Sequence, residues 1–154
     1  MLVLPVMLGL TLGLIDLGRA FVFGVAVQEG ARQAARLAAS ANYDMNVDDN
    51  AVFGRLVAAS TPALVGCQNS TPVTAWPVNR PCNGGTWTFS LSIINGGTTY
   101  PTLAAARTAN ALSGANITAT ASGSVALVPG LQTGAFGLVL PQIGVQGQAA
   151  MVIL

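Results

Sequence analysis

The leading 28 residues constrain the fold of this chain more than any other feature. Their only charged residues are Asp16 and Arg19. Removing the eleven large apolar side chains between Leu2 and Leu17 from water is favourable by roughly 15 to 30 kcal/mol. Carrying the two charges into a bilayer costs about 5 to 7 kcal/mol, so burial prevails. We therefore expect the segment to leave water. It can do so in a membrane or by packing among other helices.

A helix over residues 1–28 would be about 42 Å long, which is enough to cross the hydrocarbon core of a bilayer. Pro5 suits the first turn of such a helix, because its missing N–H has no intrahelical partner there. We therefore expect an uninterrupted helix that begins near residue 1 and continues beyond the apolar segment.

Small residues recur at every fourth position along this helix. Their spacing lets helix backbones approach closely in apolar surroundings, whereas glycines in an isolated helix cost roughly 1 kcal/mol each. A dimer of membrane anchors would explain a short series, but this one is longer than a bilayer and favours one helix packed beside many copies. Its members are Gly9, Gly13, Ala20, Gly24, Ala26, Gly30, Ala34 and Ala38, together with Ala31, Ala35 and Ala39.

The charged residues of the helix permit two interpretations. Asp16 with Arg19, and Glu29 with Arg32 or Arg36, have spacings at which ion pairs form on one helix. Alternatively, these groups pair between subunits and fix the axial stagger of a bundle, where an unpartnered charge would be strongly destabilising. The predicted assembly interface consists of Pro5, Gly9, Gly13, Asp16, Arg19, Gly24, Glu29, Gly30, Arg32 and Arg36.

The chain changes character after residue 42, so residues 1–42 are expected to form the helical part and residues 43–154 an outer domain. From Ser60 onward, Arg80 and Arg107 are the only charged residues, and polarity comes from Ser, Thr, Asn and Gln. Only 7% of the whole chain is charged, against roughly 25% in an ordinary soluble domain. This composition disfavours most soluble enzymes, and a net charge of +1 gives no electrostatic footprint for nucleic acid.

Hydropathy and turn signals predict that the outer domain is a small antiparallel sheet with short helices. The residues from Trp87 to Ile93 alternate between apolar and polar, which is typical of a half-buried strand, and Asn95-Gly96-Gly97 is a hairpin signal. Further strands are expected over residues 117–120, 125–128 and 148–154. Asn46 with Asp49 is an imperfect capping box for a helix through Ala59, and a second helix is expected from Pro101 to Leu112. The predicted fold class is α+β, with a long apolar helix before a β-rich domain.

Cys67 and Cys82 enclose a segment rich in turn-forming residues. A disulfide between them would close a loop of about 16 residues and stabilise the fold by roughly 3 kcal/mol; the alternative is two free, buried thiols. The chain has no His and no further Cys to complete a metal site. The disulfide is preferred, and it indicates an oxidising, extracytoplasmic location.

Residues that carry chemistry are nearly absent. The chain has no His, no Lys and no glycine loop of the kind that holds phosphates, so we expect no enzymatic activity and no cofactor. Asp44, Asp48 and Asp49 lack the spacing and the final Glu of a calcium loop, which favours helix capping and solvation. Asn69 and Asn116 begin glycosylation sequons and so allow surface glycans.

The leading segment also resembles a known family. The Leu4-Pro5 pair, the aliphatic run, the block from Ile15 to Ala20 and the stretch VQEGARQAARLAA from Val27 to Ala39 are similar to the amino-terminal region of TadE-like pilins of the tight-adherence (Tad) system, which are related to type IV pilins. The stretches NITATASGSVAL and GQAAMVIL resemble the terminal β segments of that family.

The resemblance implies a type IV pilin-like fold and a structural subunit. Such a subunit is held in the inner membrane, meets the pilus assembly machinery and polymerises with copies of itself through its leading helix. The product is an extracellular pilus on a prokaryotic cell, used for surface attachment. A minor pilin or pseudopilin that primes or caps a filament is implied equally, and a membrane-anchored binding module is a third alternative.

Overall fold

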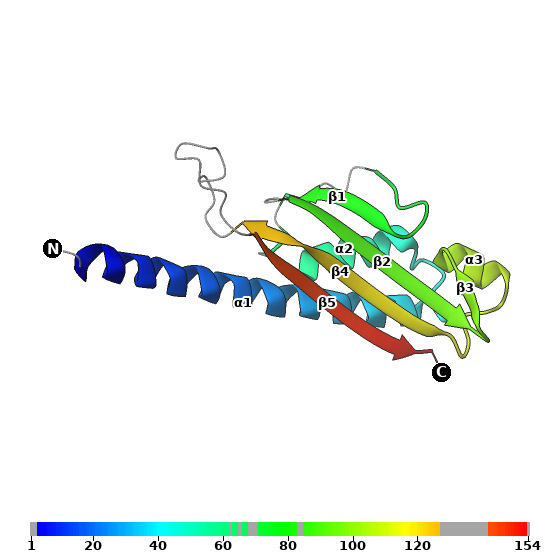
Figure 1. The fold of residues 1–154 in the computed structure, drawn as a ribbon. Coiled ribbons are helices and arrows are strands. Elements are labelled where there is room, and N and C mark those ends of the chain that lie inside the picture. Colours follow the sequence, from blue (N-terminus) through cyan, green and yellow to red (C-terminus); the bar gives the residue numbers. More distant parts are fainter. Residues whose placement is uncertain are drawn as a thin grey trace.

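A single long helix, α1 (Val3–Ser40), leads the chain, and an antiparallel sheet covers its carboxyl-terminal half. A computed structural model describes residues 3–61, 63–64, 66–67, 71–82, 85–126 and 142–153, without the side chains at positions 5, 6, 9, 12, 16, 125, 126 and 142. Figure 1 shows the first half of α1 extending beyond the sheet. The predicted α+β class is therefore confirmed.

The sheet has five strands, and all their pairings are antiparallel. The order is β1 (Val78–Cys82), β2 (Gly85–Asn95), β4 (Asn116–Ala126) and β5 (Gln142–Val152), with β3 (Thr98–Tyr100) paired to the end of β2. The described residues also contain two short helices, α2 (Asp49–Ala59) and α3 (Leu103–Thr108). Figure 1 shows α1 and α2 on one face of the sheet.

The hydrophobic core lies between the sheet and these two helices. Trp87, Phe89, Leu91 and Ile93 of β2 are buried, as their alternating pattern predicted. The ring of Phe89 meets that of Phe53 from α2 edge-on at a centroid distance of 5.1 Å. The intervening polar residues of β2 point to the opposite face, because successive side chains of a strand alternate.

Strand β4 is longer than predicted. The sequence indicated two separate strands here, over residues 117–120 and 125–128. Instead, Gly123 continues the ladder opposite Val145 of β5. Its missing side chain makes room for Trp87, since a Cβ at Gly123 would lie 2.3 Å from the indole. Residues 127 and 128 lie outside the described residues.

Strand β5 begins at Gln142, six residues before the predicted start at residue 148, and ends at Val152. The hairpin signal is confirmed: Asn95 pairs with Thr98 across Gly96 and Gly97, both of which have positive φ (57° and 83°). Such a two-residue turn matches the twist of the flanking strands and favours glycine.

Helix α2 has a different cap from the predicted one. Asp48, and not Asn46, is the N-cap: its carboxylate accepts a hydrogen bond from Ala51 N at 2.7 Å. Asn46 instead donates its backbone N–H to Asp44 at 2.9 Å, within the turn before the helix. The prediction failed because several neighbouring Asn and Asp residues can all act as caps.

Helix α3 is shorter than the predicted span from Pro101 to Leu112. Thr102 caps its first turn, and the helix ends at Thr108. Asn110 then adopts a positive φ of 50°, which turns the chain out of the helix. Leu112 follows as a buried core residue.

The predicted disulfide is present. Cys67 and Cys82 are bonded, with their Cα atoms 4.1 Å apart. The bond joins the segment that follows α2 to the end of β1. It therefore fixes one edge of the sheet to the helical layer.

Candidate assembly surface

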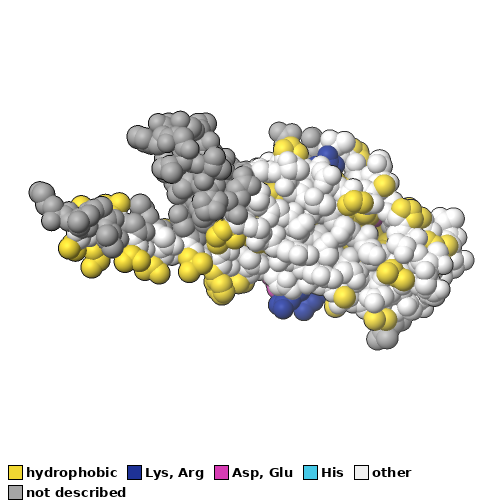
Figure 2. All heavy atoms as spheres, viewed as in Figure 1, with side chains coloured by type: hydrophobic (Ala, Val, Ile, Leu, Met, Phe, Trp, Pro, Cys, Tyr) yellow, Lys and Arg dark blue, Asp and Glu magenta, His cyan; other side chains and the backbone are white. Residues whose placement is uncertain are grey.

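The first half of α1 carries a large apolar surface that the subunit itself does not cover. Eleven large hydrophobic side chains of this segment are 52–74% exposed, and Figure 2 shows the yellow side chains along the protruding helix. Exposed apolar patches of this extent mark interaction sites in soluble or membrane-associated proteins. The side chains are Val3, Leu4, Met7, Leu8, Leu10, Leu14, Ile15, Leu17, Phe21, Val22 and Val25.

These side chains do not lie on a single face of the helix. Leu14 and Ile15 are adjacent in sequence and both exposed, as are Phe21 and Val22. Adjacent residues of an α-helix point about 100° apart. One flat partner therefore cannot cover all of them, and several neighbouring helices can.

From Val27 onward, α1 belongs to the core of its own subunit. Ala31, Ala34, Ala35 and Ala38 are completely buried, and α1 contacts β4, β5 and α2. The expectation that the small-residue series packs against other copies as far as Ala39 is therefore wrong for these four alanines. Their small side chains instead allow the subunit's own sheet and α2 to approach α1.

Two glycines show how close that approach is. A Cβ at Gly147 of β5 would lie 2.6 Å from the backbone carbonyl carbon and oxygen of Val27. A Cβ at Gly30 would lie 1.8 Å from Ser60 Oγ and 2.8 Å from Leu56 O of α2. Gly30, which we predicted at the interface between subunits, thus lies buried against α2.

The glycines of the protruding half are in a different situation. A Cβ at Gly13, Gly18 or Gly24 would meet nothing within 4 Å. Glycine therefore has no packing role within the subunit at these positions. Pro5, Gly9 and Asp16, the other predicted interface residues of this half, lie outside the described side chains, so the pairing of Asp16 with Arg19 stays a prediction.

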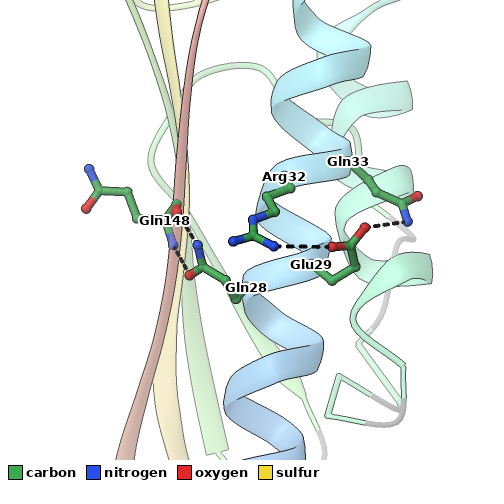
Figure 3. Close-up of polar contacts among 5 residues, drawn as sticks. All are labelled: Gln28, Glu29, Arg32, Gln33 and Gln148. Carbon is green, nitrogen blue, oxygen red and sulfur yellow. Dashed lines mark hydrogen bonds and ion pairs between the residues drawn. The ribbon is translucent and has the colours of Figure 1, made fainter.

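The boundary between the two halves of α1 is marked by a hydrogen-bonded pair that the sequence did not indicate (Figure 3). Gln28 Nε2 donates to Gln148 O at 2.7 Å, and Gln148 N donates to Gln28 Oε1 at 3.0 Å. The side-chain amide thus satisfies both backbone groups of one residue of β5, as a neighbouring strand would. The available signal was an amide side chain immediately after a long apolar segment.

The next residue of α1, Glu29, has its described contacts with residues of the same helix (Figure 3). Arg32 Nη1 lies 3.9 Å from Glu29 Oε2, and Gln33 Nε2 donates to Glu29 Oε1 at 3.1 Å. This is the pairing within one helix that the spacing allowed. Arg19 and Arg36 are exposed, and no ion pair of the described residues includes either of them.

Two charged residues hold the outer domain together, and the sequence indicated neither role. The carboxylate of Asp49, which is 6% exposed, accepts hydrogen bonds from Trp76 Nε1 at 2.7 Å and from Leu103 N at 3.2 Å. Asp49 thus connects α2 to the start of α3 instead of capping a helix.

Among the described residues, no group of acidic, His or Cys side chains could hold a metal ion.

The second of these two charged residues, Arg107 of α3, binds the segment that follows the end of α1. Its guanidinium donates to the carbonyl oxygens of Ala41, Asp44 and Val47, at 2.6 to 3.2 Å. Carbonyl groups at a helix end have no partner within the helix. The guanidinium of Arg107 therefore supplies hydrogen-bond donors to three carbonyl groups in the segment that connects α1 to α2.

The outward face of the sheet is polar and uncharged over its two central strands. Thr88, Ser90 and Ser92 of β2 lie opposite Ser122, Thr120 and Thr118 of β4, and the hydroxyl groups of Ser90 and Thr120 share a hydrogen bond. The sequence predicted this kind of surface. Asn116, the second sequon, is exposed at the start of β4, whereas Asn69 lies outside the described residues.

No described helix combines the length and the apolar character that crossing a membrane requires.

Comparison with known proteins gives one match. The family model of TadE-like proteins matches residues 1–36. No curated protein matched the chain, and no solved structure did. The matched segment contains the whole exposed apolar half of α1 and ends four residues before the end of that helix. The resemblance seen in the sequence is thereby confirmed: residues 1–36 are similar to TadE-like proteins.

Proposed function

We propose that this chain is a structural pilin that polymerises through α1 into an extracellular Tad-type pilus used for surface attachment. The observation that carries this proposal is the exposed apolar half of α1, from Val3 to Val25. Covering its large side chains with neighbouring helices would stabilise the assembled state by roughly 10 to 20 kcal/mol per subunit. No other described surface of the chain offers a comparable gain.

The division of α1 supports an open polymer. Its second half is fixed to the subunit's own sheet by the close contact of Gly147 with Val27, so the first half projects in a defined direction. Contacts between different surfaces of identical copies produce filaments when the rotation does not close. In this arrangement residues 1–42 form the helical part, of which the exposed half up to Val25 lies in the filament core, and residues 43–154 form the exterior.

The surroundings of the subunit follow from the same features. Before assembly, the apolar half of α1 is held in the inner membrane, from which the pilus machinery extracts it. The outer domain then lies outside the cytoplasm, in keeping with the Cys67–Cys82 disulfide. Its uncharged Ser and Thr face is exposed on the filament, where surface glycans can be attached. We propose no enzymatic role, no cofactor and no nucleic-acid partner.

The test has two parts. Filaments sheared from producing cells are analysed by mass spectrometry: this chain as the dominant protein supports a major structural subunit. A trace amount supports the minor pilin that primes or caps a filament, and absence from the filaments supports a membrane-anchored binding module.

The second part is Phe21→Asp, which places a charge on the exposed half of α1. We expect loss of filaments with an unchanged melting temperature of the outer domain. Ile94→Asp, on the outward face of β2, is the matched control and should assemble. Normal filaments from Phe21→Asp would refute polymerisation through α1.

A further inference from the structure

A shallow groove of about 770 Å³ runs between α1 and α2. Helix α2 returns alongside α1 in the opposite direction, because Ser60 at its end meets Gly30 of α1 while its start follows closely on the end of α1. The lining includes two cations, one from each helix. The residues that matter here are Gln33, Arg36, Leu37, Ser40, Gly54 and Arg55.

Among the described residues, no carboxylate forms an ion pair with the arginines of this groove. Arg36 and Arg55 are both exposed, and the described ion pair of the chain, Glu29 with Arg32, includes neither of them. An open groove with two unpaired guanidinium groups is suited to a partner that carries carboxylates.

The chain itself carries such carboxylates, displaced along the same axis. Asp44 and Asp48 are exposed in the connection between α1 and α2. Their described hydrogen bonds, to Asn46 N and Ala51 N, use Oδ1 of each side chain. Asp49 is buried and occupied by Trp76 and Leu103. The connection therefore presents two acids to a neighbour.

The separation of the two charge groups along α1 is the important quantity. Asp48 and Arg55 lie seven residues apart at the start and middle of α2, which is roughly 10 Å along the helix axis. Arg36 precedes the end of α1 by four residues, and Asp44 lies beyond that end. Within one subunit Asp48 is thus displaced from Arg55 by about two helical turns, although Ser40 and Ala51 extend the lining of the groove toward the connection. A second copy shifted along α1 by roughly that distance would bring its acids level with the two arginines.

We propose that the α1–α2 groove of one copy binds the α1–α2 connection of the next copy, with Asp44 and Asp48 of one paired to Arg36 and Arg55 of the other. This inference rests on the proposed polymerisation through α1 and assigns a contact between outer domains that accompanies it. The contact is between unlike surfaces, so it repeats without closing. Complementary charges of this kind select register and orientation more than they add affinity, so the contact sets the axial shift between copies.

The test is disulfide cross-linking in assembled filaments. In the variant Asp44→Cys with Arg55→Cys, mild oxidation should produce a ladder of dimers and higher multimers that a reducing agent abolishes. A cross-link needs Cα atoms within about 7 Å, and the displacement along α2 keeps the two positions of one chain apart. The control Asp44→Cys with Ser92→Cys places the second thiol on the outward face of β2 and should give no ladder.

A charge series covers the case in which the cysteine variants do not assemble. Arg55→Glu should lower the filament yield at least tenfold at an unchanged melting temperature, and Asp44→Arg added to it should restore at least part of the yield. Normal filaments from Arg55→Glu, or filaments of the first cysteine pair without a ladder, overturn the groove contact and leave the proposed function intact. Absence of filaments from the unmodified chain overturns the proposed function instead.

Discussion

The side-chain amide of Gln28 in α1 is hydrogen-bonded to both backbone groups of Gln148 in β5, at 2.7 and 3.0 Å. A residue near the middle of the leading helix thereby completes the ladder of a strand that follows 120 residues later. The edge of a sheet exposes N–H and C=O groups that can pair with other chains. This pair occupies one such position, just beyond the end of the exposed apolar half of α1.

Gln28→Ala should destabilise the outer domain by about 1 kcal/mol, because two hydrogen bonds at a solvent-accessible edge are replaced by bonds to water. Chemical denaturation measures the free energy of unfolding, and hydrogen exchange at the Gln148 amide should accelerate. The control is Gln33→Ala, which removes only a contact with Glu29 on the helix surface. Equal effects of the two variants would contradict a special role for Gln28.

Gly147→Ala should destabilise the chain by roughly 1 to 3 kcal/mol, because overpacking forces backbone shifts. The new Cβ would lie 2.6 Å from the backbone of Val27 and would separate β5 from α1. Gly144→Ala, in the same strand, is the matched control, since a Cβ there meets nothing within 4 Å. Thermal unfolding of the two variants checks the prediction, and equal melting temperatures would show that α1 does not depend on this close contact.

Asp49→Ala should destabilise the outer domain by about 2 to 4 kcal/mol, because it leaves the buried donor Leu103 N and the half-buried donor Trp76 Nε1 without their acceptor. The emission of Trp76 should change together with stability. Asp44→Asn is the control, because Asp44 is exposed and an amide oxygen can also accept the bond from Asn46 N. A neutral effect of Asp49→Ala would mean that water replaces the carboxylate at this position.

Gly24→Leu should abolish assembly and leave the outer domain as stable as before. A Cβ at Gly24 would meet no described atom within 4 Å, so a larger side chain is expected to interfere with the close approach of neighbouring helices. Filament yield and the melting temperature of the outer domain are measured together. Normal filaments from this variant would exclude position 24 from any close helix contact.

Mutation of Cys67 and Cys82 to Ser should lower the free energy of unfolding by roughly 3 kcal/mol, the value for a loop of this size. The bond joins the segment after α2 to the end of β1, so the loss should appear as early exchange in β1. Denaturation of the oxidised and the reduced wild-type chain gives the same comparison without mutation. An identical midpoint for both would show that core packing alone holds this edge.

The sequence predicted correctly those elements whose residue pattern has a single structural explanation. The alternation from Trp87 to Ile93 arises from a strand with one buried face, and two glycines after Asn95 arise from a tight turn. The two strands expected over residues 117–120 and 125–128 are one strand, in which Gly123 makes room for the ring of Trp87. The small residues after Gly30 misled because close packing within a subunit and between subunits requires the same side chains.

Of the candidate assembly surface, only the part on the first half of α1 could be predicted from the sequence. Exposed apolar residues on α1 follow directly from hydropathy, so the segment up to Val25 was identified from the sequence. The roles of Gln28, Asp49 and Arg107 depend on segments brought together from distant parts of the chain, 120 residues apart for Gln28 and Gln148. No local pattern contains that information.

The position of β5 against α1 has a consequence for biosynthesis. Strand β5 covers part of the alanine-lined face of α1, since Gly147 of β5 lies against Val27 of α1. The ribosome makes α1 first and β5 last. Until that strand emerges, only α2 and β4 can cover part of this face, and the part that faces β5 stays exposed to water. Nascent chains that terminate before Gln142 should therefore be degraded rapidly, and pulse-chase labelling of truncated messages would reveal it.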